Sequence, residues 1–306
     1  MSALVECVPN FSEGRRKDVI VAIVSAISAE NVALLDVSSD VDHNRTVVTF
    51  AGTPEAIQQA MFAGAKVAVQ SIDLSLHSGV HPRMGAVDVV PFVPLRNISL
   101  EACAQLATAF GQRVGAELGI PVYLYEAAAT RPERFNLADV RRGGYEALVQ
   151  EIGREAHRTP DFGPSNVGPA GAMIIGARGP LIAFNAFLDT DDVEIARSIA
   201  STIRASGGGL PYLKALGLLV NGKAQVSMNI IDYRKTTLHQ IMQWVRHEAE
   251  KYGVSVTQTE LVGLIPQSAL IDYAITDLQL PASTRFLTLE QRLGQVMGDY
   301  QEINFE

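Results

Sequence analysis

Residues 31–52, NVALLDVSSDVDHNRTVVTFAG, decide the fold that the sequence predicts. Two apolar runs rich in β-branched residues flank a short polar segment, which is the pattern of two strands joined by a turn. The periodicity around this pair predicts a strand at 3–9, helices at 15–29 and from Thr53–Pro54 to about 71, and a strand at 86–94. The resulting order is β-α-β-β-α-β, which is the order of a ferredoxin-like unit. A helix at 99–118 and a short strand at 121–125 follow it.

A similar pattern of strands and helices recurs after residue 165. Strand-like runs begin at 171 and 181, and helices are predicted at 191–205 and 236–252. The Pro- and Gly-rich stretch 157–171 has the composition of a connection between two halves. We therefore expect an α/β (α+β) protein with an N-terminal subdomain at 1–165 and a C-terminal subdomain with a short helical tail at 166–306. Both would be ferredoxin-like, with facing sheets and outer helices.

Composition and charge narrow the class of protein. The 306 residues are 47% hydrophobic, and the net charge of −8 argues against a nucleic-acid binder, which normally carries a basic surface. No apolar run approaches the length of a membrane span, and the N-terminus shows no signal-peptide pattern. Two cysteines are too few for a disulfide framework. We expect a cytoplasmic protein that acts on small molecules, without a membrane or nucleic-acid partner.

Two glycine-rich segments resemble anion-binding loops. The segment 217–223, GLLVNGK, lacks the hydroxyl residue and the following helix of a phosphate-binding loop, so a hairpin turn at Asn221–Gly222 explains it better. The segment 206–211, SGGGLP, fits either a backbone anion nest or a helix stop with a flexible connection.

The stretch 77–94, HSGVHPRMGAVDVVPFVP, holds two histidines four residues apart. That spacing serves zinc sites on helices, but Gly79 and Pro82 oppose a helix here, and no metal is expected. His81 precedes a proline on a loop that enters a strand, where an imidazole could transfer protons at neutral pH. The residues alone leave two interpretations open, a structural histidine loop and a catalytic base.

Several long blocks resemble the glutamate formiminotransferase family, the transferase portion of the bifunctional formiminotransferase–cyclodeaminase. They are LVECVPNFSEGR at 4–15, NRTVVTF at 44–50, HPRMGAVDVVPFVP at 81–94, AFGQRVGAELGIPVYLYEAA at 109–128, PDFGPS at 160–165, GARGPLIAFN at 176–185 and LVGLIPQSAL at 261–270. The resemblance is collinear from residue 3 to about 275.

This resemblance implies a fold, an activity and a set of site residues. The family transfers a formimino group from N-formimino-L-glutamate to N5 of tetrahydrofolate in histidine degradation, giving 5-formiminotetrahydrofolate and L-glutamate. Its two ferredoxin-like subdomains enclose a tunnel, usually in a homodimer. The histidine of its H-P-R-M-G motif is catalytic and falls on His81. Its folate-binding stretch falls on Gly163, Pro164, Ser165, Asn166, Val167, Gly168, Pro169, Ala170, Gly171 and Ala172.

The implied chemistry needs further side chains. One imidazole can act as base and then as acid while the carbon passes between two amines. A carboxylate or amide is expected at the pterin edge, for which Asn10, Asp36 and Asp88 are candidates, and cations near the glutamate tail, for which Arg45, Arg83 and Arg178 are candidates. Residues 163–172 depart from the bulkier, Trp-containing segment common in the family. Two alternatives stay open: formyl transfer between N-formylglutamate and tetrahydrofolate, and a non-catalytic folate-binding protein.

Overall fold

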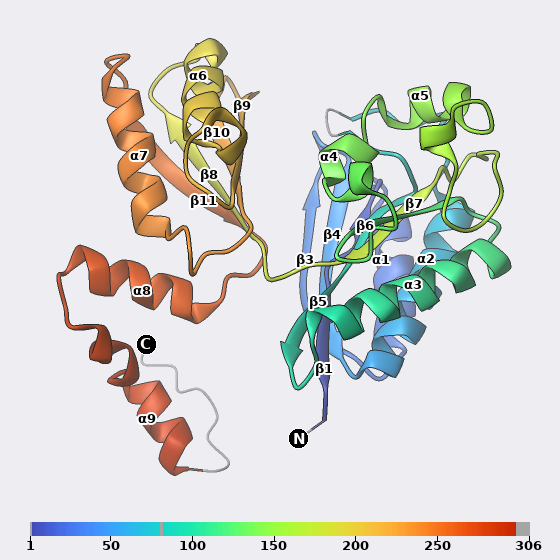
Figure 1. Cartoon of the computed structure of the whole chain (residues 1–306), viewed down its shortest axis with the longest axis horizontal. Coiled ribbons are helices and arrows are strands. Elements are labelled where there is room, and N and C mark those ends of the chain that lie inside the picture. The colour runs from blue at the N-terminus through green and yellow to red at the C-terminus, as the bar shows by residue number, and fades with distance from the viewer. Residues whose placement is uncertain (1, 80–81, 298–306) are drawn as a thin grey trace. The chain divides into compact units, whose positions relative to one another are not determined.

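The computed structural model describes residues 2–79 and 82–297, and the chain divides into two compact units. The first extends to Gly179 and the second begins at Pro180. In Figure 1 the first unit runs from blue to green and the second from yellow to red.

The first unit holds a mixed sheet with helices on both faces (Figure 1). Its strands are β1 (Leu4–Cys7), β2 (Asn10–Phe11), β3 (Ala33–Asp40), β4 (Arg45–Gly52), β5 (Val87–Arg96), β6 (Val122–Glu126) and β7 (Met173–Ala177). Its α-helices are α1 (Lys17–Ser28), α2 (Pro54–Ser71), α3 (Leu100–Glu117), α4 (Leu137–Val140) and α5 (Gly144–Glu151). Short 3-10 turns lie at Pro132–Arg134 and Ala156–Arg158.

The pairing of the first strands is that of a ferredoxin-like unit. β1 and β2 each lie antiparallel to both β4 and β5, and β3 lies antiparallel to β4 on the outer side. The predicted strand at 3–9 is therefore one line of backbone interrupted between Cys7 and Asn10. The order β3-β4-β1/β2-β5 is that of a ferredoxin-like unit, which confirms the expected type of fold and supplies the strand order that the pattern alone does not fix.

Local signals start the helices where the sequence predicts them. The Thr53 hydroxyl accepts a hydrogen bond from the backbone N–H of Ala56, and Pro54 occupies the first turn, where its missing N–H costs nothing. Ser99 caps α3 in the same way through Ala102. The buried faces of these helices pack on the sheet, where Phe110 of α3 meets Phe92 of β5 with ring centroids 5.6 Å apart. On the other face, α4 and α5 cover β5, β7 and β6.

Strand β7 differs from its predicted place. The sequence pattern assigns residues 171–177 to the second half, but β7 lies parallel to β5 on one side and to β6 on the other. Stretch 157–171 is likewise part of the first unit, because the Asp161 carboxylate binds the Leu124 N–H and the Arg134 guanidinium. The structure thus divides the chain later than the boundary expected at 165/166. A segment rich in Pro and Gly has the composition of a linker even when one of its polar side chains is buried in a domain. Composition alone therefore could not show that stretch 157–171 belongs to the first unit.

The second unit has one four-stranded sheet in the order β11-β8-β10-β9, with every pairing antiparallel. Its elements are β8 (Ile182–Leu188), α6 (Val193–Ile203), β9 (Leu213–Val220), β10 (Lys223–Ile230), α7 (Leu238–Glu250), β11 (Val256–Val262), α8 (Gln267–Asp277) and α9 (Leu289–Val296), with 3-10 turns at Ala205–Gly207 and Ala282–Phe286. This is again the ferredoxin-like order. α6 and α7 share one core with the sheet.

The two glycine-rich segments of this unit are explained structurally. Asn221 and Gly222 both have positive φ and join the paired residues Val220 and Lys223, which confirms the predicted two-residue hairpin. In the SGGGLP segment, the backbone N–H groups of Gly207, Gly208 and Gly209 already donate to Arg204 and Ala205 carbonyls, so they form a helix stop and not an anion nest.

Candidate active site

A small pocket in the first unit brings together most of the predicted substrate contacts. It is lined by Asn10, Phe11, Ser12, His43, Asn44, Arg45, His77, Arg83 and Asp88. Its volume of about 10 Å³ is room for roughly one water-sized group. These residues come from β2, the start of β4, the loop after α2 and the start of β5. Pairing of β2 with both β4 and β5 places the three strands side by side.

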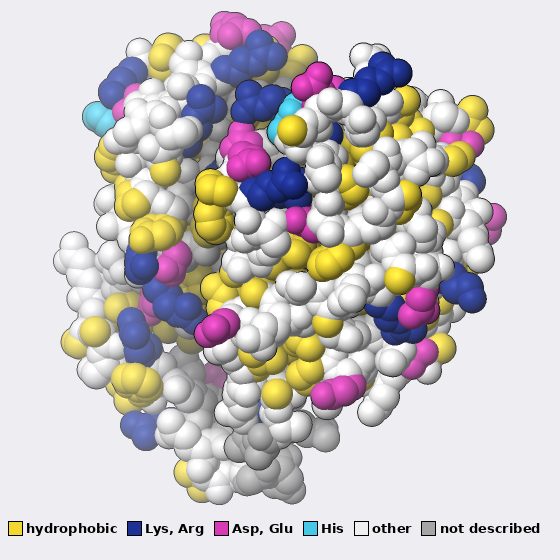
Figure 2. All heavy atoms as spheres, turned by 45° about the vertical axis from the view of Figure 1, so that its right-hand side comes forward, with side chains coloured by type: hydrophobic (Ala, Val, Ile, Leu, Met, Phe, Trp, Pro, Cys, Tyr) yellow, Lys and Arg dark blue, Asp and Glu magenta, His cyan; other side chains and the backbone are white. Residues whose placement is uncertain are grey.

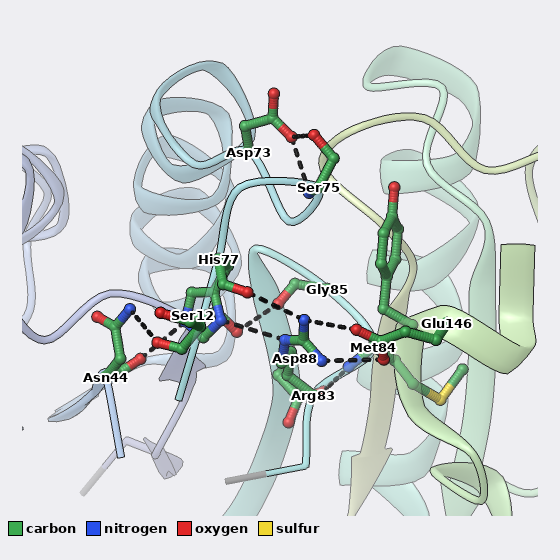
Figure 3. A network of polar contacts seen from close by, with 12 residues as sticks. Ser12, Asn44, Asp73, Ser75, His77, Arg83, Met84, Gly85, Asp88 and Glu146 are labelled. Carbon is green, nitrogen blue, oxygen red and sulfur yellow. Dashed lines mark hydrogen bonds and ion pairs between the residues drawn. The ribbon is translucent and has the colours of Figure 1, made fainter. Parts of the chain in front are cut away.

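Arg83 lies between His77 and Glu146 (Figure 3). Its Nε donates to His77 Nδ1 at 3.1 Å, and its two terminal nitrogens donate to the Glu146 carboxylate at 3.0 and 2.8 Å. This two-bond clamp holds the guanidinium plane and lowers the pKa of Glu146, mainly through the hydrogen bonds from Arg83. Arg83 is therefore a fixed part of the pocket wall.

The contacts of His77 define its tautomer. Since Nδ1 accepts from Arg83, the ring proton belongs on Nε2, which lies 3.1 Å from the Asn44 carbonyl oxygen and donates to it. Burial lowers the pKa of His77, and the charge of Arg83 adds to this effect, together outweighing the hydrogen bond to Asn44. With its pKa lowered and both ring nitrogens engaged, His77 supports Arg83 and Asn44 in this arrangement.

Asn44 ties the histidine loop to the rest of the pocket. Its side-chain oxygen accepts the Gly14 N–H at 2.9 Å, and its side-chain nitrogen donates to the Ser78 carbonyl at 3.0 Å. Gly79 packs so closely on this turn that a Cβ there would lie 2.5 Å from the His43 carbonyl oxygen. The glycine between the two histidines is thus required by close backbone approach.

The segment after Arg83 is fixed by Asp88, whose side chain is 3% exposed. One Asp88 oxygen accepts the Met84 N–H at 2.8 Å, and the other pairs with Arg141. Ser12 donates its hydroxyl proton to the Gly85 carbonyl at 2.7 Å (Figure 3). Asp88 therefore shapes the start of β5 from inside, and its carboxylate is already occupied by protein partners.

His81, the predicted catalytic residue, lies outside the described residues. The described chain ends at Gly79 and resumes at Pro82, and Arg83, two residues after His81, lines the pocket. The assignment of His81 stays a prediction.

The predicted folate stretch, residues 163–172, lies against the same segment. Ala172 N–H donates to the Met84 carbonyl at 2.9 Å, and Ala86 N–H donates to the Ala170 carbonyl at 2.8 Å. Gly85 and Gly171 form a bridge so close that a Cβ on Gly85 would lie 2.0 Å from the Ala172 carbonyl oxygen. The structure therefore joins two segments that the sequence predicts separately. The exposed residues of the stretch are Gly163, Ser165, Asn166, Gly168 and Pro169, whereas Ala170, Gly171 and Ala172 are buried.

Arg178 lies apart from the pocket. It follows β7, and its backbone N–H donates to Phe92, four residues along β5 from Asp88, which corresponds to about 13 Å. Its guanidinium donates to the Gly179 carbonyl at 3.0 Å and lies near Tyr125, whose pKa burial raises to about 12. Of the predicted contacts, Asn10, Arg45, Arg83 and Asp88 are brought together, while Arg178 is not. Asp36, on β3, does not line the pocket either.

Sequence reasoning missed Ser12, Asn44, Glu146 and Arg141 as parts of this site. Glu146 and Arg141 lie 63 and 53 positions from their partners Arg83 and Asp88. Glu146 lies on the short helix α5 and Arg141 directly follows the short helix α4, and neither helix has a strong local pattern, so no signal in the sequence links them to the pocket.

The described part of the chain contains no group of three or more His, Cys, Asp or Glu side chains arranged to hold a metal ion. Within those same residues, no helix combines the length and the apolar character needed to cross a bilayer.

Comparisons with known proteins agree with this geometry. Residues 4–178 match the model of the "Formiminotransferase domain, N-terminal subdomain", and residues 183–293 match that of the "Formiminotransferase domain". The chain is 49% identical over 296 residues to a glutamate formimidoyltransferase of Thermoplasma acidophilum, covering 95% of this chain and 97% of that protein. It is 46% identical over 284 residues to a glutamate formimidoyltransferase of Streptococcus pyogenes serotype M1, covering 92% and 95%.

The formimidoyltransferase-cyclodeaminase of Mus musculus is also 46% identical, over 90% of this chain and 52% of that protein. Two domain matches that together span both units, and identities of this size over nearly the whole length of single-function relatives, leave one assignment. The chain belongs to the formiminotransferase family.

Proposed function

We propose that this protein is a glutamate formimidoyltransferase, which moves the formimino group of N-formimino-L-glutamate to N5 of tetrahydrofolate. The observation that carries the proposal is the identity of 49% and 46% to two proteins of that name over nearly the full length of both chains. The pocket supports it with polar groups suited to small anionic substrates, both of which carry carboxylates.

His81 is the proposed proton shuttle. N5 of tetrahydrofolate attacks the formimino carbon, forming a new C–N bond and a tetrahedral adduct. The imidazole accepts the proton released from N5 and then donates it to the glutamate nitrogen as the old C–N bond breaks. One group thus acts as general base and general acid, a contribution of roughly 10²- to 10⁴-fold. The neutral, fully bonded state of His77 supports His81 as the titrating histidine of the loop.

Residues 163–172 are the proposed folate-binding stretch. Its exposed part is continuous with the backbone that pairs with Met84 and Ala86, directly after the H-P-R motif. A folate bound to the exposed residues of this stretch would lie close to the segment that follows His81 in the chain. This gives the proximity that a transfer between two substrates needs. The protein is further proposed to be a cytoplasmic homodimer acting in histidine degradation and one-carbon metabolism.

The test is an assay with tetrahydrofolate and one donor at a time, followed by acid treatment and measurement of 5,10-methenyltetrahydrofolate by absorbance. Turnover is expected with N-formimino-L-glutamate and loss of at least roughly a hundredfold in His81→Ala. His77→Gln keeps a neutral hydrogen-bonding side chain in the same loop and is expected to retain most of the activity. Turnover with N-formylglutamate alone, or folate binding without turnover of either donor, would contradict the proposal.

A further inference from the structure

Arg83 connects the two described flanks of residues 80 and 81. His77 precedes these residues in the chain, and Arg83 follows them. Arg83 Nε donates to His77 Nδ1 at 3.1 Å, and one terminal nitrogen donates to the His77 carbonyl oxygen at 3.2 Å (Figure 3). The Arg83 side chain is 15% exposed, so these contacts are largely shielded from water. One guanidinium therefore fixes the distance between the two flanks.

Helix α5 holds Arg83 in place with its first turn. The Glu146 carboxylate accepts both terminal nitrogens of Arg83, at 3.0 and 2.8 Å, and the Tyr145 N–H donates to the Arg83 carbonyl oxygen at 2.9 Å. Gly144 makes this approach possible. It has a φ of +65°, and a Cβ there would lie 3.2 Å from a Glu146 carboxylate oxygen and 3.3 Å from the Arg83 carbonyl oxygen. A side chain and the backbone of one helical turn thus hold the same residue.

The pair of Arg83 and Glu146 differs from an ordinary surface pair in what lies behind the arginine. On the face shown in Figure 2, basic and acidic side chains lie next to one another and do not form separate fields, so pairing alone indicates no function. The Glu146 side chain is 62% exposed, and such a pair adds little to the free energy of unfolding. Arg83, however, also binds His77, whose Nε2 donates to the Asn44 carbonyl oxygen at 3.1 Å. The pair therefore sets the local geometry of this loop more than the stability of the unit.

We propose that Glu146 is a positioning residue of the transfer reaction, which acts through Arg83 on the two flanks of His81. The inference rests on the proposed transferase function and on His81 as its proton shuttle. Proton transfer needs the imidazole within hydrogen-bond reach of the reacting nitrogens. A displacement of about 1 Å can cost roughly a hundredfold in rate. A clamp that fixes one flank against the other therefore raises turnover without contacting either substrate.

The experiment measures steady-state turnover of N-formimino-L-glutamate and tetrahydrofolate by the full chain. Glu146→Ala removes the clamp, and Glu146→Gln keeps one acceptor oxygen without the charge. Glu151→Gln is the matched control, because Glu151 ends the same helix and pairs with Arg158 at 2.6 Å. Thermal unfolding of each variant checks that it is folded.

Glu146→Ala is expected to lower kcat roughly tenfold, because Arg83 keeps its bonds to His77 but loses both bonds that fix its guanidinium plane. The KM of each substrate should stay within about twofold, since Glu146 contacts neither of them. Glu146→Gln should lie between Glu146→Ala and the wild type, and it decides if Glu146→Ala does not fold. Glu151→Gln should keep kcat within about twofold of the wild type.

A double-mutant cycle tests whether Glu146 acts through Arg83. Arg83→Lys keeps the positive charge but lacks the planar fork that the Glu146 carboxylate holds. In the Arg83→Lys background, Glu146→Ala should therefore lower kcat by a smaller factor than in the wild type. Equal factors in the two backgrounds would overturn the inference, because Glu146 would then act independently of Arg83.

The single variants can overturn the inference as well. A kcat within about twofold of the wild type in folded Glu146→Ala would do so. A KM that rises as much as kcat falls would assign Glu146 to substrate binding, and an equal loss in Glu151→Gln would assign it to general support of α5. Failure of the proposed function is a different result, namely a wild-type protein that transfers no formimino group, and a wrong assignment of His81 would show as retained turnover in His81→Ala.

Discussion

Arg134 binds the segment that leads into the proposed folate stretch. Its replacement should measurably lower the local stability of the first unit. Its side chain is 2% exposed, and it pairs with Asp161, whose side chain is 8% exposed. It also donates to the Thr159 carbonyl. Arg134→Met keeps a long apolar stem and leaves the Asp161 carboxylate buried without its cation. Removal of one partner of a buried ion pair costs about 3–5 kcal/mol.

The local contacts of Asp161 set the expected size of the effect. Its oxygens still accept the Leu124 N–H at 2.8 Å and the Thr130 hydroxyl proton, so part of the charge stays solvated by the protein. We therefore expect the lower end of the range, about 3 kcal/mol, which corresponds to about a hundredfold change in an opening equilibrium. β6, which contains Leu124, should report this change.

Hydrogen exchange measured by mass spectrometry is the assay. Peptides covering β6 should lose about a hundredfold in protection in Arg134→Met. Arg142→Gln, which removes an exposed pair, should leave protection within about twofold. Adding Asp161→Asn to Arg134→Met removes the buried charge and should recover part of the loss. Protection of β6 within about threefold of the wild type in Arg134→Met would refute the reasoning. Loss of one partner of a buried ion pair costs more free energy than a threefold change in protection represents.

Three further outcomes are expected. Gly85→Ala should abolish stable folding of the first unit, measured by thermal unfolding, because its Cβ would lie 2.0 Å from a backbone oxygen, while Gly168→Ala, with no atom within 4 Å, should unfold like the wild type. The pKa of His77 is lowered from 6.5 in the folded protein, so the unfolded state binds the proton more readily. The contribution of His77 to the free energy of unfolding should therefore be fully present above pH 6.5 and should be lost as the pH decreases from 6.5 through the lowered pKa. His77→Gln should lack this part of the pH dependence in denaturant titrations, and an identical slope in both proteins would contradict the assignment. Thr237→Ala removes the capping box of α7 and should cost about 1 kcal/mol in the same titrations; no change would show that the cap is dispensable.

Much of the order of helices and strands along the chain follows from the sequence because it depends on local patterns. The turn at Asn221–Gly222 and the caps Thr53 and Ser99 act on their own neighbours, so their effect is visible without the structure. The order in which these strands pair within each sheet is not fixed by such patterns and is given by the structure.

The place of β7 could not be predicted, for a physical reason. A five-residue apolar strand buried on both faces carries no mark of its partner, and its parallel pairing with β5 and β6 joins segments far apart in the chain. The same holds for the site. Asn10, Arg45, Arg83 and Asp88 lie in recognisable blocks, whereas Glu146 and Arg141 act only through contacts made across the fold.

The anchoring of residues 163–172 at both ends has a consequence for how this family can diversify. Asp161 and Phe162 tie the entry of the stretch to β6, and Ala170 to Ala172 tie its exit to the start of β5 and to β7. The residues between these fixed ends can change in bulk and polarity while the scaffold keeps its shape. Substitutions among the residues between these ends should therefore be able to retune the proposed folate site while the backbone pairing with Met84 and Ala86 stays in place.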